Sequence, residues 1–227
     1  MIESVRAMSI SPDSDGWNRR QLAYYPKIGY GTRAARCSRG ISTSFSNSNG
    51  NPVRKQTMPE QSEKKILTPE QAVRAACILF ELNTGEHDLL EMAKRAGVPC
   101  DDDAERKALS REWYGFVHAA VVYGLMAQAS NQVMAEYLRS TRTLLSQTAG
   151  YTPEQIEAFI DDTFSGYIRL MAQNQQKQCP ALFYQRLVGE NAIETLPKER
   201  VAFLSGMMAI TICALLDKLG QYEFLVE

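Results

Sequence analysis

The side chains best suited to metal binding or acid–base chemistry are few and widely spaced. The chain has two histidines, His87 and His118. Glu91 follows His87 by four positions, which places both on one helix face, but two ligands do not complete a metal site. His118 lies in an apolar run and has no carboxylate three or four positions away. We therefore interpret His118 as a core histidine and expect neither a metal site nor a catalytic histidine.

Five cysteines stand alone, with no C-x-x-C pair among them: Cys37, Cys77, Cys100, Cys179 and Cys213. An odd number of isolated thiols is typical of a reducing cytosol, not of a disulfide scaffold or a zinc module. Cys77 and Cys213 have apolar neighbours, so we interpret them as buried. Cys179 is interpreted as the most accessible thiol, but without a histidine nearby in sequence it is not expected to be a nucleophile. We expect a cytoplasmic protein.

Two acidic clusters lack the spacing of a functional site. Asp101, Asp102 and Asp103 are adjacent, whereas a calcium loop needs alternate ligands, a central glycine and a distal glutamate. Acids at this point favour the start of a helix. Asp161 and Asp162 diverge by about 100° around a helix. Phosphate-binding glycine loops and a G-x-S-x-G turn are also absent from the sequence, which therefore predicts no catalytic residue, no metal ligand and no cofactor.

Charge and composition divide the chain near residue 65. Residues 1–65 carry eleven Lys/Arg and five Asp/Glu, a balance of +6, and residues 66–227 carry fourteen and twenty-one, a balance of −7. Because the basic charges are dispersed among serine, asparagine and glycine, we interpret residues 1–65 as a disordered tail. The alternatives are a transit peptide, an over-extended start before Met58, and single-stranded nucleic-acid binding around Tyr24–Tyr30. No feature of residues 1–65 strongly indicates nucleic-acid binding.

From residue 66 to residue 227 the sequence predicts a single helical domain. Thr68-Pro69-Glu70-Gln71 and Thr152-Pro153-Glu154-Gln155 each combine an N-cap threonine, a first-turn proline and a glutamine that completes a capping box. No run shows the sustained alternation of a strand. Helices are therefore predicted from Pro69 to about Asn83, from His87 to Ala96, from about Ala104 to Ala149 with a break near Ser130, from Pro153 past Met171, from Ala181 to Val188, and after Pro197.

The longest uncharged stretch is Val201–Leu216, which has sixteen residues. Apolar side chains would occupy every side of this helix, so we interpret it as the buried central helix of the domain. A membrane-spanning helix needs ~20 apolar residues, and this shorter run is diluted by Ser205, Gly206 and Thr211, so a soluble core helix is favoured. The predicted partner is the apolar run 113–129, because small residues in both segments let the backbones approach closely.

The predicted fold class is all-α, a compact bundle of about six or seven helices preceded by a disordered N-terminal tail. The favoured function is a non-catalytic helical interaction or scaffold protein that self-associates. Tyr222, Phe224 and Val226 are the candidate contact residues, since they make the C-terminus unusually apolar.

Two other hypotheses stay open. The first is a helical-bundle ligand-binding protein or enzyme with a pocket between residues 113–129 and 201–216, lined by Trp113, His118 and Tyr123. The second is membrane association through Val201–Leu216. Whether the protein is an enzyme is not decided by the sequence.

Overall fold

A computed structural model describes residues 64–225. The chain divides into two units, Met1–Gln61 and Ser62–Glu227, and the account below concerns the second. The predicted tail, the proposed start at Met58, the tyrosine-rich segment, Cys37 and Val226 lie outside the described residues.

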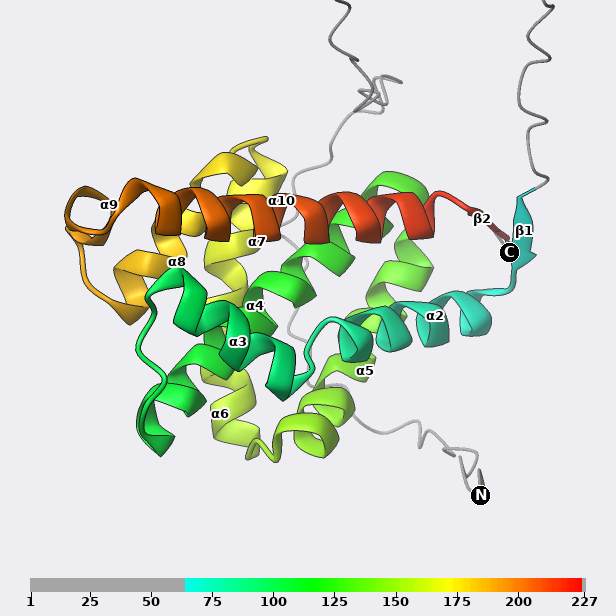
Figure 1. The fold of residues 1–227 in the computed structure, drawn as a ribbon. Coiled ribbons are helices and arrows are strands. Elements are labelled where there is room, and N and C mark those ends of the chain that lie inside the picture. Colours follow the sequence, from blue (N-terminus) through cyan, green and yellow to red (C-terminus); the bar gives the residue numbers. More distant parts are fainter. Residues whose placement is uncertain (1–63, 226–227) are drawn as a thin grey trace, which may run out of the picture. The chain divides into compact units, whose positions relative to one another are not determined.

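The described part of the chain is an all-α domain, as predicted (Figure 1). If α6, η1 and α7 are taken as one continuous helix, it contains eight helices, against the six or seven expected. The elements in chain order are β1 (Lys65–Leu67), α2 (Pro69–Leu82), α3 (Glu86–Ala96), α4 (Asp103–Gln128), α5 (Asn131–Ala149), α6 (Pro153–Ala158), the π-helix η1 (Phe159–Phe164), α7 (Ser165–Ala172), the 3-10 turn η2 (Gln176–Gln178), α8 (Cys179–Leu187), α9 (Ala192–Thr195), α10 (Lys198–Leu219) and β2 (Tyr222–Phe224).

Local side-chain chemistry sets the helix starts. Thr68 Oγ1 accepts a hydrogen bond from the backbone N–H of Gln71 at 3.3 Å, and Gln71 Oε1 accepts one from the N–H of Thr68 at 3.1 Å. The same reciprocal capping box opens α6 at Thr152 and α4 at Asp102, where the acid cluster was expected to cap a helix. The predicted break before α5 is confirmed, because the Ser130 side chain caps that helix. These helix starts could be predicted because capping depends on residues that are close in sequence.

A short two-stranded sheet contradicts the prediction that the domain contains no strand. β1 and β2 pair in parallel, with Lys65 opposite Tyr222 and Leu67 opposite Phe224. Each strand has three residues, which is too short for an alternating pattern to be recognised. The pairing joins segments from opposite ends of the domain, and no local sequence signal reports such a contact.

α4 is the central helix of the domain. Every residue from Gly115 to Val122 is buried, so this part of α4 is enclosed on all sides. It contacts α2, α3, α5, η1, α7, α8 and α10. α4 is therefore the buried central helix of the domain, a place that the sequence analysis had assigned to Val201–Leu216.

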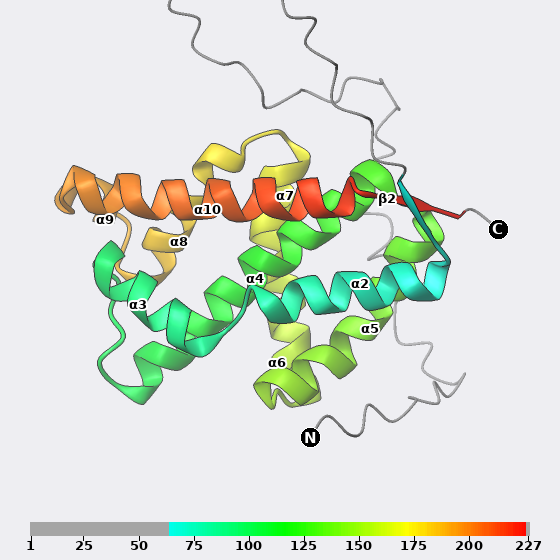
Figure 2. The ribbon, with the colours of Figure 1, turned by 45° about the vertical axis from the view of Figure 1, so that its right-hand side comes forward.

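α10 lies at the surface, which corrects the prediction of a buried central helix. Figures 1 and 2 show α10 crossing in front of α4. One side of α10 is buried, through Leu204, Met208, Thr211, Ile212, Leu215 and Leu219. The predicted pairing with α4 is confirmed, because Gln128 Nε2 donates to Leu216 O at 3.1 Å and Leu219 fills the space beside Gly124. The remaining apolar side of α10 is exposed.

Candidate interaction surface

His118 is a bonded core residue, as predicted. It is 1% exposed, and its two ring nitrogens lie 3.0 Å from the Tyr137 hydroxyl and 3.2 Å from Thr141 Oγ1. Thr141 Oγ1 donates its proton to Tyr137 O, so it accepts from His118 Nε2–H, and Nδ1 accepts from the Tyr137 hydroxyl. Burial lowers the pKa of His118 to about 3, which keeps the ring neutral. Both nitrogens are occupied, so neither is presented to a ligand.

The residues proposed to line a pocket between α4 and α10 have separate partners. Trp113 Nε1 donates to Asn83 O at 2.8 Å, and the Tyr123 hydroxyl accepts from Gln176 Nε2 at 3.0 Å. His118 is bonded to α5 through Tyr137 and Thr141. The structure therefore does not bring these three polar groups together around one space.

A buried carboxylate that the sequence analysis missed joins α4 to α7 and α8. Glu112 is 7% exposed, and its oxygens accept from the Tyr167 hydroxyl at 3.0 Å and from Arg186 Nη1 at 3.2 Å. Burial raises the pKa of Glu112, while Arg186 and the Tyr167 hydroxyl oppose that shift. Its position next to Trp113, at the start of the apolar run, is the one sequence signal that could have suggested burial. Its partners are remote in sequence and gave no signal.

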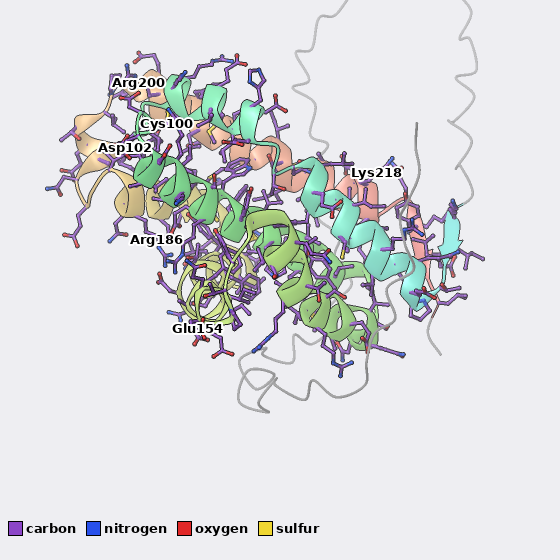
Figure 3. All side chains as sticks on the ribbon, turned by 90° about the horizontal axis from the view of Figure 1, so that it is seen from below. Cys100, Asp102, Glu154, Arg186, Arg200 and Lys218 are labelled. Atoms are coloured by element: carbon purple, nitrogen blue, oxygen red, sulfur yellow. The ribbon has the colours of Figure 1, made fainter. Side chains whose placement is uncertain are left out.

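The π-helix η1 is held by two arginines from neighbouring helices. Arg186 Nη2 donates to Asp162 O at 3.1 Å and to Asp162 Oδ1 at 3.0 Å. Arg111 Nη2 donates to Ala158 O at 3.1 Å, and its Nε donates to Thr163 Oγ1 at 3.1 Å. Figure 3 shows Arg186 beside the α6–η1–α7 helix, which is viewed end-on. A π-turn is often found at functional sites, but here the polar groups around it are bonded to one another and support the fold.

Cys179 and Cys213 do not lie where the sequence analysis placed them, and Cys77, interpreted as buried, is half-buried. Cys179 was interpreted as accessible, but it is buried at the start of α8, and burial raises its pKa to about 12. Cys213 was interpreted as buried, but it is exposed on α10. Burial likewise raises the pKa of Cys77 to about 11. The thiols of Cys77 and Cys179 are therefore protonated at neutral pH and poor nucleophiles.

No metal-binding cluster is formed within residues 64–225. In this part of the chain, no three His, Cys, Asp or Glu side chains lie close enough together to hold a metal ion. Two of the side chains considered from the sequence, His87 and Asp161, are exposed and lie on different helices.

The predicted C-terminal contact residues are only partly exposed. Phe224 is 7% exposed, because β2 pairs with β1 and turns this side chain inward. Tyr222 is half-buried and lines a shallow hollow of about 240 Å³ together with Lys65, Leu67, Gln71, Arg74, Ala75 and Ile78. β2 therefore packs against the domain, and Phe224 is not available as the contact residue that the sequence analysis proposed.

A continuous exposed apolar surface lies on the outer face of α10. The term outer face of α10 denotes the exposed residues Ala202, Gly206, Ala209, Ile210, Cys213 and Ala214. The partly exposed Phe203 and Met207 flank them. Ile210 is 65% exposed, and a Cβ added to Gly206 would have no atom within 4 Å. The Arg95 guanidinium lies 4.1 Å from the centroid of the Phe203 ring and supports that side chain at the edge of the face.

α10 also has the length and composition of a membrane-crossing helix. It is the one described helix to meet that criterion, and only 28% of its most apolar 18-residue window is buried. The criterion is weak evidence for a membrane, since soluble core helices also meet it. What distinguishes α10 from a typical core helix is its low burial.

Comparisons with known proteins add no identification. No protein-family model matches the chain, and neither the curated proteins nor the solved structures contain a significant match.

Proposed function

We propose that this protein is a non-catalytic helical interaction protein that self-associates through the outer face of α10. The observation that carries the proposal is a six-residue apolar surface on the outer face of α10, with Ile210 projecting from it at 65% exposure. Contiguous exposed apolar surface of this kind marks interaction sites in soluble proteins. The buried polar groups around His118 and Glu112 are bonded to neighbouring side chains, so they support the fold and give no sign of a reaction centre.

The composition of the outer face favours a protein partner over lipid. Alanine and glycine gain little from entering a bilayer, whereas they allow a second helix to approach closely. Glu199 and Asp217 are exposed at the two ends of the same face, and carboxylates are poorly placed for an anionic membrane surface. We expect the protein to act in the cytoplasm as a soluble assembly.

Sedimentation velocity of the full chain over roughly 5 to 500 µM tests this proposal, since a single helix face supports only weak association. We expect the weight-average mass to rise above the monomer value of 25.5 kDa with concentration. Ile210→Asp should hold the protein at monomer mass across the range. A wild-type mass that stays at 25.5 kDa throughout would contradict self-association.

Leu82→Asp is the matched control for Ile210→Asp. Leu82 is 74% exposed on α2, so the variant removes a similar apolar side chain from a different surface. It should self-associate like the wild type. Flotation with neutral phosphatidylcholine vesicles separates the lipid hypothesis, because binding that Ile210→Asp abolishes and Leu82→Asp leaves intact would assign the face to a membrane.

A further inference from the structure

The outer face of α10 has a projection and a depression four residues apart. Ile210 projects from the helix, and Gly206, which has no side chain, leaves a gap between its larger neighbours Phe203 and Met207. Phe203, Gly206, Met207 and Ile210 have the i, i+3, i+4, i+7 spacing of a hole that receives one side chain from a facing helix. The floor of this hole is the glycine, and partly exposed Phe203 and Met207 form its walls.

A projection and a hole on one face can complement each other across a two-fold axis. If two copies of α10 run antiparallel about a point midway between Gly206 and Ile210, each Gly206 lies opposite Ile210 of the second copy. Each isoleucine then enters the hole of the other helix, so the interface uses the same surface twice. A parallel pair would place Gly206 against Gly206 and leave both projections without a hole.

We propose that the occupant of the outer face is α10 of a second copy, packed antiparallel with Ile210 in the hole over Gly206. This assignment rests on the proposed function and specifies its partner, orientation and register. α10 has 22 residues and is therefore about 33 Å long. A strip about 10 Å wide buries roughly 650 Å² over both copies, which is below the roughly 1,000 Å² of a stable protein interface. The dimer is accordingly weak and reversible.

The register also fixes which charges meet at the ends of the interface. Glu199 lies seven residues before Gly206, and Asp217 lies seven residues after Ile210. At 100° per residue, these four residues fall within about 40° of one another around the helix. Glu199 therefore lies opposite Asp217 of the second copy, and the two-fold axis repeats this like-charge contact at the other end.

These carboxylate contacts give the dimer an unusual salt dependence. Added salt screens the repulsion, so wild-type dimerisation strengthens as NaCl rises from about 20 to 300 mM. The net charge of −1 combines +6 in residues 1–65 with −7 in residues 66–227, so general repulsion between copies has to be measured separately, with a charge change away from α10. Lys198 and Lys218 lie about 100° from the centre of the face and point to its sides.

Charge reversal at one end tests the register. Asp217→Lys replaces both like-charge contacts with attraction between Glu199 and a cation on the second copy, and a cation suits the C-terminal end of α10. We expect the dimer Kd to fall roughly three- to tenfold at low salt, with added NaCl now weakening association. Glu199→Lys should act in the same direction, and the double reversal should restore like-charge contacts and the wild-type sign of the salt dependence. Sedimentation velocity at two NaCl concentrations measures all four proteins.

Glu81→Lys provides the matched control. Glu81 is exposed near the C-terminal end of α2, so this variant makes the same charge change at an equivalent helix position away from α10. It should leave the dimer Kd and its salt dependence as in the wild type. Single and double reversals that act additively, without restoring the wild-type salt dependence, would overturn the antiparallel register.

The outcomes separate this inference from the proposed function. A wild-type protein that stays monomeric contradicts both. Association that Ile210→Asp abolishes, but that ignores the charge reversals at residues 199 and 217, contradicts the register alone.

Discussion

α4 and α10 are both long apolar helices, yet one is enclosed and the other is not. Between Gly115 and Val122 every residue of α4 is buried, whereas α10 exposes Gly206, Ile210 and four other residues on its outer face. Glycines show the same contrast. A Cβ on Gly115 would lie 2.4 Å from Thr163 Cγ2, while one on Gly206 would meet nothing within 4 Å. Apolar composition alone therefore does not distinguish a core helix from a helix that presents a contact surface.

The largest expected effect compares the two sides of α10. Met208 is 1% exposed, so Met208→Asp places a carboxylate in the core without a partner and should abolish cooperative unfolding. Ile210→Asp lies two residues away on the opposite side and should change the free energy of unfolding of the monomer by less than about 0.5 kcal/mol. Chemical denaturation at low protein concentration, followed by circular dichroism, measures both. Equal destabilisation by the two variants would contradict the one-sided burial of α10.

An intermediate effect concerns the buried histidine of α4. The folded-state pKa of His118 is about 3, below its ordinary value of 6.5, so the unfolded chain binds more protons between these values. The stabilisation is therefore complete above pH 6.5 and is lost as pH falls toward 3. From pH 6.5 to pH 5 the free energy of unfolding should fall by roughly 2 kcal/mol, because His118 binds a proton only in the unfolded chain.

Denaturant titrations at several pH values measure this loss. His118→Gln should remove it, whereas His87→Gln, which changes an exposed histidine on α3, should retain it. A pH dependence that is the same in all three proteins would contradict the assignment of this loss to His118.

The smallest expected effects come from adding one methyl group to each helix. Gly206→Ala should raise the free energy of unfolding of the monomer by about 0.5 to 1 kcal/mol, because alanine favours a helix and no atom obstructs its Cβ. Gly115→Ala should lower it by about 1 kcal/mol, since the new Cβ collides with Thr163. Urea midpoints measure both changes, and shifts of the same sign would remove the contrast between α4 and α10.

The helix ends could be predicted because their determinants are local. Thr68 with Gln71, Asp102 with Glu105 and the left-handed Gly97 each act within a few residues. The surface position of α10 could not be predicted in the same way, because every side of that helix is apolar in the sequence. Only its packing shows which side faces α4.

Contacts between residues far apart in sequence could not be predicted either. Glu112 is bonded to Tyr167 and Arg186, and β1 pairs with β2, yet none of these partners is close in sequence. For the candidate surface, the sequence indicated small apolar residues in α10 but assigned them to packing against α4. The structure places Gly124 and Leu219 in that contact and leaves open space beside Gly206.

The π-helix η1 has a consequence for how this helix tolerates a change of length. Its wider turn, within Phe159–Phe164, accommodates one residue more than an α-helical turn would. Deleting the exposed Asp161 would therefore let the turn close to α-helical width while Tyr167, beyond it, keeps its direction. Deleting the exposed Arg169 from the regular helix α7 would instead rotate Met171 by about 100° away from the core. The helix thus holds one place where a residue can be lost without turning the segment that follows.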